Sequence, residues 1–231
     1  EFSDGDFCFF LKSIKAFAIG LIKCKCHYYF FMNQESFWQN DELSDLENCH
    51  ISLYRNHFSE NEADLYLSNL KKINWKQNEI VVFGTKHLEP RETAWFGDSG
   101  VSYKYSGIVH KAKPWFPLLE DIRVRVQVAS GAIFNSVLLN RYRDENDGVA
   151  WHADDEPELG AFPTIGSVSF GASRKFQLRE KSKKGEIFTT FLHHGDLLIM
   201  HPPTQQHWLH CVPKSRKKTT ERINLTFREI V

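Results

Sequence analysis

The C-terminal segment Arg222-Ile223-Asn224-Leu225-Thr226-Phe227-Arg228 alternates polar and apolar residues, which is the pattern of a β-strand with two different faces. The polar face carries two guanidinium groups, an amide and a hydroxyl: Arg222, Asn224, Thr226 and Arg228. Arginine binds carboxylates through paired hydrogen bonds, so this face is suited to a small dicarboxylate. An exposed edge strand would show the same alternation, and the segment alone does not separate the two interpretations.

A second segment, Trp151-His152-Ala153-Asp154-Asp155-Glu156, contains potential metal ligands. In an extended chain His152 and Asp154 point the same way, so an imidazole and a carboxylate can bind one ion. With a second histidine they would form a two-histidine, one-carboxylate site, which is typical of non-haem Fe(II) and leaves room for a keto acid and dioxygen. A histidine among acids in a surface loop is the simpler alternative for this motif taken alone.

Candidates for the second histidine are concentrated near residue 200: His193, His194, His201, His207 and His210. Their spacing does not choose among them. His210 is favoured because residues 206–210 resemble a strand that leads through a basic loop towards residues 222–228, and His207 is the second choice. His193 and His194 precede a Gly-Asp turn, which favours surface positions.

Asn140 and Tyr142, in Leu138-Leu139-Asn140-Arg141-Tyr142, share one face of another extended segment. Their amide and phenol could donate hydrogen bonds to the same dicarboxylate as Arg228. Taken alone, the pair would be a core tyrosine and an asparagine near a turn.

The pattern of the chain changes from helical to extended near residue 134. Capping-box spacing from Ser59 to Glu62 predicts one helix, and Pro117 begins a second that buries Leu118, Leu119, Ile122 and Val126. Six short β-rich segments follow: 134–142, 164–170, 175–179, 187–192, 197–200 and 222–230. This order predicts an α+β fold with helices packed on an antiparallel sandwich or jelly roll.

The composition is that of an ordinary folded protein with local concentrations of charge. The 231 residues are 42% hydrophobic and have zero formal net charge, so no global field attracts nucleic acid. Two basic clusters, residues 174–184 and 214–218, could neutralise phosphates or form solvated loops. Five cysteines make a disulfide framework unexpected and favour a reducing compartment. Residues 1–50 are assigned no function, and lysines interrupt their apolar stretch too often for a membrane span.

Together these motifs resemble the AlkB family of Fe(II)/2-oxoglutarate dioxygenases, and the likeness is to the homologues that repair methylated DNA, the duplex-preferring one and the one acting on single strands and RNA. The matching pieces are Asn140-Arg141-Tyr142, His152-Ala153-Asp154-Asp155-Glu156, residues 167–172, 194–200, 207–210 and 222–228. The resemblance covers residues 51–231 and implies a double-stranded β-helix (jelly-roll) core at about 130–231. It also implies flanking helices and an N-terminal nucleotide-recognition lid at about 75–112.

The resemblance implies a role for each site residue. Three residues would hold Fe(II): His152, Asp154 and His210. Six would bind 2-oxoglutarate, the first three at its distal carboxylate: Arg228, Asn140, Tyr142, Arg222, Asn224 and Thr226. Dioxygen would be the second co-substrate.

The lid would recognise a base flipped out of its stack. Tyr105 would stack on that base opposite His152, while Tyr103 and Glu156 would approach its edge. Further expected substrate contacts are Arg91, Ser106 and Asp155. Packing of a strand pair is the alternative for the two tyrosines. Phe83 resembles the wedge of the duplex-preferring homologue, although residues 80–83 also fit a buried strand.

The implied activity is oxidative demethylation of 1-methyladenine and 3-methylcytosine in DNA, with RNA as a further candidate. It would be coupled to decarboxylation of 2-oxoglutarate to succinate and release of formaldehyde. We expect a monomeric DNA-repair enzyme of the nucleus or cytoplasm without membrane association. One alternative is the same oxygenase chemistry on a protein or small molecule, and another is a non-enzymatic nucleic-acid-binding module.

Overall fold

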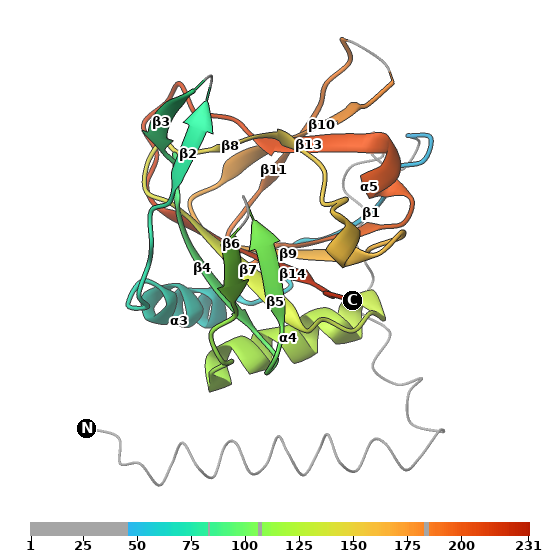
Figure 1. Ribbon diagram of the computed structural model, residues 1–231. Coiled ribbons are helices and arrows are strands. Elements are labelled where there is room, and N and C mark those ends of the chain that lie inside the picture. Colours follow the sequence, from blue (N-terminus) through green and yellow to red (C-terminus); the bar gives the residue numbers. More distant parts are fainter. Residues whose placement is uncertain (1–45, 83, 106–107, 183–184) are drawn as a thin grey trace, which may run out of the picture. The chain divides into compact units, whose positions relative to one another are not determined.

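The computed structural model describes residues 46–82, 84–105, 108–182 and 185–231, which form two antiparallel β-sheets packed face to face (Figure 1). The larger sheet has six strands in the order β1 (His50–Tyr54), β12 (Leu197–His201), β9 (Ile165–Gly171), β14 (Arg222–Arg228), β7 (Ser136–Tyr142) and β4 (Glu92–Gly97). The smaller sheet has the order β11 (Phe188–Leu192), β10 (Arg174–Glu180), β13 (Trp208–Val212) and β8 (Val149–His152).

The path of the chain between these sheets is that of a jelly roll. From β7 onward the strands alternate between the larger and the smaller sheet, except that β10 and β11 form a hairpin within the smaller one. The two sheets enclose a set of buried apolar residues that includes Tyr142 and Leu198 from the larger sheet and Phe176 and Leu178 from the smaller. The predicted jelly-roll core is therefore confirmed.

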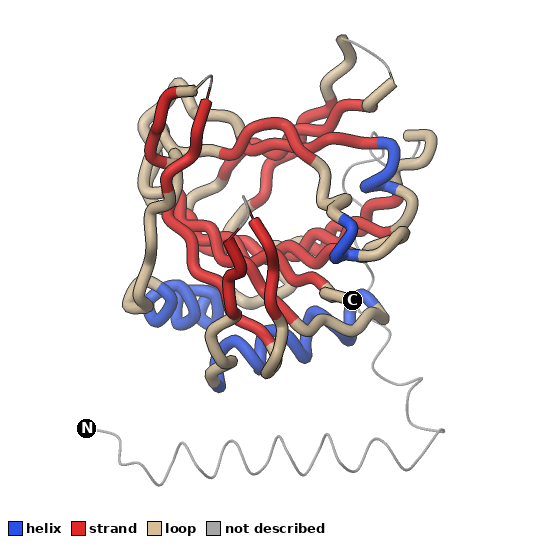
Figure 2. The backbone as a smooth tube through the Cα atoms, in the orientation of Figure 1, coloured by secondary structure: helices blue, strands red, loops and turns tan. Residues whose placement is uncertain are grey.

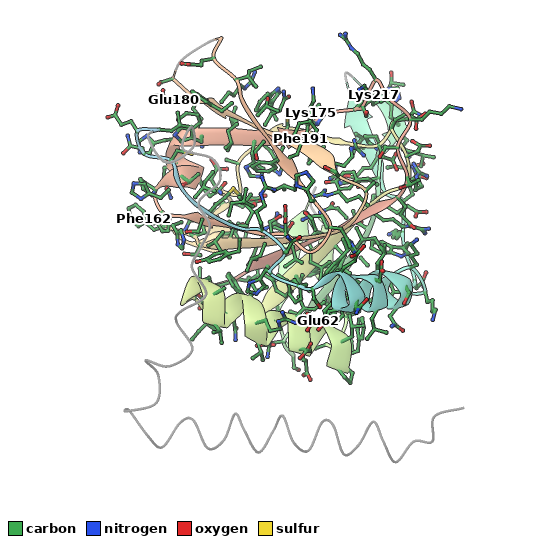
Figure 3. All side chains as sticks on the ribbon, turned by 180° about the vertical axis from the view of Figure 1, so that it is seen from behind. Glu62, Phe162, Lys175, Glu180, Phe191 and Lys217 are labelled. Carbon is green, nitrogen blue, oxygen red and sulfur yellow. The ribbon has the colours of Figure 1, made fainter. Side chains whose placement is uncertain are left out.

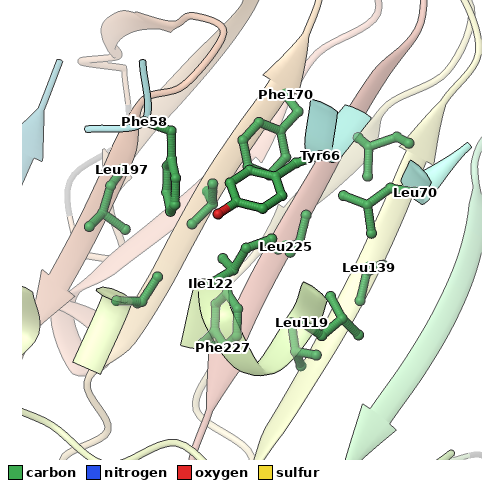
Figure 4. Packing of buried hydrophobic residues seen from close by; sticks show 14 of the residues in the cluster. Phe58, Tyr66, Leu70, Leu119, Ile122, Leu139, Phe170, Leu197, Leu225 and Phe227 are labelled. Carbon is green, nitrogen blue, oxygen red and sulfur yellow. The ribbon is translucent and has the colours of Figure 1, made fainter. Parts of the chain in front are cut away.

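Two helices cover the outer face of the larger sheet, α3 (Glu60–Leu70) and α4 (Pro117–Ser130) (Figure 2). Between helices and sheet lies a second apolar cluster, in which Tyr66 of α3 packs against Phe170 of β9 and Ile122 of α4 lies close to Phe227 of β14 (Figure 4). The odd-numbered residues of β14 face this cluster, so its even-numbered residues face the other sheet.

Both helices begin where the sequence predicts. Glu62 accepts the backbone N–H of Ser59 at 2.9 Å, as a capping box requires. Pro117 is the first residue of α4, and Leu119, Ile122 and Val126 are buried. None of the helices in the described ranges is long and apolar enough to cross a membrane.

Smaller elements complete the structure. Two separate hairpins are formed by β2 (Glu79–Val82) with β3 (Thr85–Leu88) and by β5 (Ser102–Tyr105) with β6 (Ile108–Lys111). The short helices are η1 (Pro157–Leu159) and α5 (Thr204–His207). Val81 of the first hairpin is 66% exposed and Ile80 is half-buried, so the part of residues 80–83 whose burial is described is not a buried strand.

Two other expectations differ from the structure. Residues 206–210 were expected to be one strand, but α5 continues to His207 and β13 starts at Trp208, because a tight turn after Pro203 precedes the strand. β4 was expected in the lid, yet it pairs with β7 at the edge of the larger sheet.

The turn before β12 generates a stability prediction. Gly195 has φ +83°, and an added Cβ would lie 2.4 Å from the carbonyl oxygen of Phe58, whereas Gly100 has φ +89° with nothing within 4 Å. Gly195→Ala should lower the free energy of unfolding by roughly 2–5 kcal/mol and Gly100→Ala by roughly 1–2 kcal/mol, because only the first adds a backbone clash to the conformational cost. Urea unfolding measures both, and equal losses would contradict this close packing.

Candidate active site

Three potential metal ligands converge in the space between the sheets. His152 at the end of β8 and His210 in β13 are direct cross-strand neighbours, and their ring centroids are 4.3 Å apart. Asp154 follows His152 by two residues, and the ligand atoms of the three side chains lie within 4.8 Å of one another. The fallback histidine, His207, is exposed at the end of α5 and lies outside this cluster.

The hydrogen bonds and charges of the cluster leave its ligand atoms available to a cation. Nδ1 of His152 lies 2.9 Å from the carbonyl oxygen of Ala150 and donates to it, so the lone pair is on Nε2. Burial, together with His152 and Arg228, lowers the pKa of His210 to about 3 despite Asp154, so its imidazole is neutral. Burial would raise the pKa of Asp154, but its neighbours, Arg228 first among them, lower it below the usual value, so the carboxylate is ionised.

One oxygen of Asp154 is held and the other is free. Oδ1 accepts a hydrogen bond from Nη2 of Arg228 at 2.5 Å, and the backbone N–H donates to Oε1 of Gln205 at 2.9 Å. Oδ2 is buried, has no hydrogen-bond partner among the described residues, and lies 3.9 Å from Nε2 of the neutral His210. Such an oxygen is costly unless a cation binds it, so the donor set fits a divalent ion held by two imidazoles and a carboxylate.

A buried cation lies on the same face of β14, at its other end. Arg222 is 1% exposed and donates from Nη2 to Oγ of Ser169 at 2.8 Å, and its guanidinium lies 5.3 Å from the Tyr142 ring. Its Nε and Nη1 have no hydrogen-bond partner, and no carboxylate pairs with it, within the described ranges. Burial lowers the pKa of Arg222 to about 10, although Tyr142 opposes the shift. An unpaired buried guanidinium fits an anionic ligand.

The positions of the two arginines correct one expectation. Arg228 was expected at the distal carboxylate of 2-oxoglutarate, but its guanidinium contacts Asp154 and therefore lies beside the metal ligands. Arg222 lies six residues earlier on the same face of β14, does not contact Asp154, and has unused donors. The structure therefore favours Arg222, not Arg228, for the far end of a dicarboxylate.

The other residues expected to bind 2-oxoglutarate lie in cross-strand rows on the inner face of the larger sheet. Tyr142 pairs with Arg222, and Asn140 with Asn224. Nδ2 of Asn224 donates to Oγ of Ser167 at 2.8 Å, and Oδ1 of Asn224 accepts a hydrogen bond from the hydroxyl of Thr226 at 3.0 Å. The Asn224 and Thr226 side chains thus bond to each other and to β9.

The residues expected to contact the substrate are only partly visible. Asp155 is exposed and bound by Lys181 at 2.7 Å, and Arg91 pairs with Glu89 at 3.1 Å. Glu156 is half-buried two residues after Asp154. Phe83, Ser106 and the side chains of Tyr103 and Tyr105 lie outside the described residues, and the backbone places both tyrosines on β5.

Sequence reasoning did not identify two residues of this site, Gln205 and Ser169. Gln205 is 1% exposed and holds the backbone of Asp154, while Ser169 accepts a hydrogen bond from Arg222. The alternation of β9 places Ser169 on the polar face, which was a usable signal. Gln205 lies in a turn with no pattern that would distinguish it.

Comparisons with known proteins agree with this geometry. Residues 50–228 match the 2OG-Fe(II) oxygenase superfamily. The chain is 40% identical over 195 residues to DNA oxidative demethylase ALKBH2 of Bos taurus, covering 80% of this chain and 69% of that protein. It is also 40% identical over 190 residues to alpha-ketoglutarate-dependent dioxygenase alkB homolog 3 of Rattus norvegicus, covering 78% of this chain and 64% of that one.

A solved structure, that of OsALKBH1, shares the fold with a TM-score of 0.60 at 16% identity, and the match covers 80% of this chain and 98% of that one. The family match makes the protein a dioxygenase that uses Fe(II), 2-oxoglutarate and dioxygen. The chain therefore belongs to the 2OG-Fe(II) oxygenase superfamily and, within it, to the AlkB family.

Proposed function

We propose that this protein oxidatively removes methyl groups from bases of DNA, with decarboxylation of 2-oxoglutarate to succinate and release of formaldehyde. The observation that carries the oxygenase chemistry is a pair of buried charged groups with unused hydrogen-bonding atoms, Oδ2 of Asp154 and Nε and Nη1 of Arg222. A divalent cation bound at the first and a dicarboxylate bound at the second would give these atoms partners. The DNA substrate is inferred from relatives that are named DNA oxidative demethylases.

In this proposal the chain positions the reactants. His152, Asp154 and His210 would hold Fe(II), and Arg228 would keep Asp154 ionised and oriented. Arg222 and Tyr142 would bind the distal carboxylate of 2-oxoglutarate, supported by Ser169. Iron, 2-oxoglutarate and dioxygen together supply the oxidation of an N-methyl group. The protein contributes a fixed orientation and removal of water, since both sheets bury the site.

The proposed substrates are 1-methyladenine and 3-methylcytosine, in DNA first and in RNA as a further candidate. Their methyl group is on the pairing edge, so these bases are already unpaired and cost little to flip. Tyr103, Tyr105 and Glu156 would contact the flipped base, and Phe83 would occupy the gap in a duplex. A monomeric enzyme acting in the nucleus or the cytoplasm completes the proposal.

An exposed basic loop provides a surface for the phosphate backbone. Lys214, Arg216, Lys217 and Lys218 are all exposed between β13 and β14, and Lys217 projects from the molecule (Figure 3). The loop lies between the strand of His210 and the strand of Arg222. Phosphates bound there would bring a nucleic-acid strand close to the site, with an affinity that falls as salt rises.

The role of Arg222 can be tested by separating ligand binding from stability. Arg222→Met should raise the KM for 2-oxoglutarate by about 100-fold, which is about 2.7 kcal/mol, because a charge-assisted pair with the distal carboxylate is lost. Without cosubstrate the variant should melt at the same temperature as the wild type or higher, since an unpaired buried charge is removed. Arg123→Met, an arginine of α4 that pairs with Asp98 at 2.7 Å, is the control for KM. An unchanged KM, or a large loss of stability, would show that Arg222 is purely structural.

The substrate can be identified with short oligonucleotides that carry one methylated base. Incubation of the enzyme with Fe(II), 2-oxoglutarate and single- or double-stranded DNA or RNA should yield the unmethylated oligonucleotide, with formaldehyde and succinate in equal amounts, as measured by mass spectrometry. Unmethylated oligonucleotides of the same sequence are the control. Succinate formation that no methylated oligonucleotide stimulates would contradict a nucleic-acid substrate and favour a protein or small molecule.

A further inference from the structure

Three of the six basic residues at 174–184 contact other parts of the protein. Arg174 is 3% exposed and donates to the backbone carbonyls of Asp144, Asp147 and Pro213. Arg179 lies over the ring of Trp151, with its guanidinium carbon 4.5 Å from the ring centroid. Nζ of Lys181 donates to Oδ2 of Asp155 at 2.7 Å. Each of these three side chains therefore has a contact within the protein.

Arg179 and Lys181 connect two strands that are not neighbours. Both come from the end of β10, and β13 lies between β10 and β8 in the smaller sheet. Each reaches past β13 to the segment that carries two of the candidate ligands: Trp151 immediately precedes His152, and Asp155 immediately follows Asp154. The two contacts therefore bracket residues 152–154, and we call residues 151–155 the ligand segment.

Lys181 also binds Gln205, the residue that accepts a hydrogen bond from the backbone of Asp154. Its Nζ donates to the carbonyl oxygen of Gln205 at 2.8 Å, and its backbone N–H donates to the carbonyl oxygen of His207 at 2.8 Å. Oε1 of Gln205 in turn accepts the backbone N–H of Asp154 at 2.9 Å. One ammonium group thus joins α5 to the ligand segment at a single point.

The ligand segment needs these contacts because few strand-pairing hydrogen bonds of the sheet fix its position. Among the described strands β8 pairs with β13 alone, so it lies at the edge of the sheet. Its register shifts beside His210, and the chain leaves the sheet after His152. A carboxylate on a loop without fixed contacts would lose conformational entropy on binding an ion. Groups that orient metal ligands from outside the coordination sphere typically change affinity by about 10–100-fold.

We propose that Arg179 and Lys181 are positioning residues that clamp the ligand segment in the geometry needed to bind the metal. This inference rests on the proposed ligands His152, Asp154 and His210, and does not depend on the nature of the substrate. It assigns to Arg179 and Lys181 a role in building the metal site.

The test is a titration of the metal-free protein with Co(II), a spectroscopic substitute for Fe(II), in the absence of cosubstrate and nucleic acid. Lys181→Met should weaken Co(II) binding by about 10-fold, because Asp154 loses its fixed position. Lys181→Arg should restore affinity to within about twofold, because a guanidinium can donate to both Asp155 and Gln205. The control is Lys72→Met, which removes an exposed lysine with no ion pair in the described part of the chain.

A second variant keeps the test informative if Lys181→Met folds poorly. Asp155→Asn removes the other partner and should weaken Co(II) binding by a similar factor, and the double variant should bind no more weakly than either single one. Amide hydrogen exchange at residues 153–156 of the metal-free variants should also be faster than in the wild type. A Co(II) affinity within twofold of the wild type in both single variants would contradict the proposed positioning role. An equal loss of Co(II) affinity in Lys72→Met would also contradict it.

The outcome of the substrate assay is independent of the outcome of this Co(II) titration. If the clamp variants bind Co(II) weakly while no methylated oligonucleotide is demethylated by the wild type, the positioning role stands and the proposed substrate falls. If the wild type demethylates the oligonucleotides but Lys181→Met and Asp155→Asn bind Co(II) normally, the proposed substrate stands and the positioning role falls.

Discussion

The contact between Arg228 and Asp154 joins the two sheets at the site, and the other site features depend on it. Arg228 is the last residue of β14 in the larger sheet, and Asp154 follows β8 of the smaller one. The guanidinium lowers the pKa of a carboxyl group that burial would otherwise neutralise. It occupies only Oδ1, so Oδ2 keeps its charge and faces the two imidazoles. Without this cation the carboxylate would be protonated or turned towards solvent, and the two histidines would be left without an anionic partner.

The inner faces of the two sheets each contribute residues to the site. The smaller sheet supplies His152 and His210 as a cross-strand pair, and the larger sheet supplies the polar row of β14. Leaving Oδ2 of Asp154 and most of the Arg222 guanidinium unpaired costs stability, and the apolar clusters on both sides of the larger sheet offset that cost. Buried groups of this kind are expected where a ligand completes the structure. Arg174 joins the turn after β7 to the loop after β13, whereas Arg179 and Lys181 contact Trp151 and Asp155 beside the ligands.

Much of this arrangement could be predicted from local sequence patterns. Alternation in residues 222–228 placed Arg222 and Arg228 on one face, and the capping box and Pro117 located both helices. The jelly roll follows from many short strands after two helices, and the family match agrees with it. Alternation alone could not tell which arginine lies beside the metal, since that depends on which end of β14 meets the loop after β8. Contacts between segments far apart in the sequence, such as Lys181 with Asp155 and Gln205 with Asp154, leave no periodic signal.

The most direct test of the account is whether His210, and not its neighbour in sequence His207, completes the metal site. Chelation of Fe(II) by a 2-oxo acid produces a charge-transfer absorption in the visible range, which can be followed when Fe(II) and 2-oxoglutarate are added to the metal-free protein without oxygen. The wild type and His207→Ala should develop this absorption with equal affinity, because His207 is exposed and outside the cluster. His210→Ala should not develop it. An unchanged absorption in His210→Ala, or its loss in His207→Ala, would contradict the assignment on which the site is built.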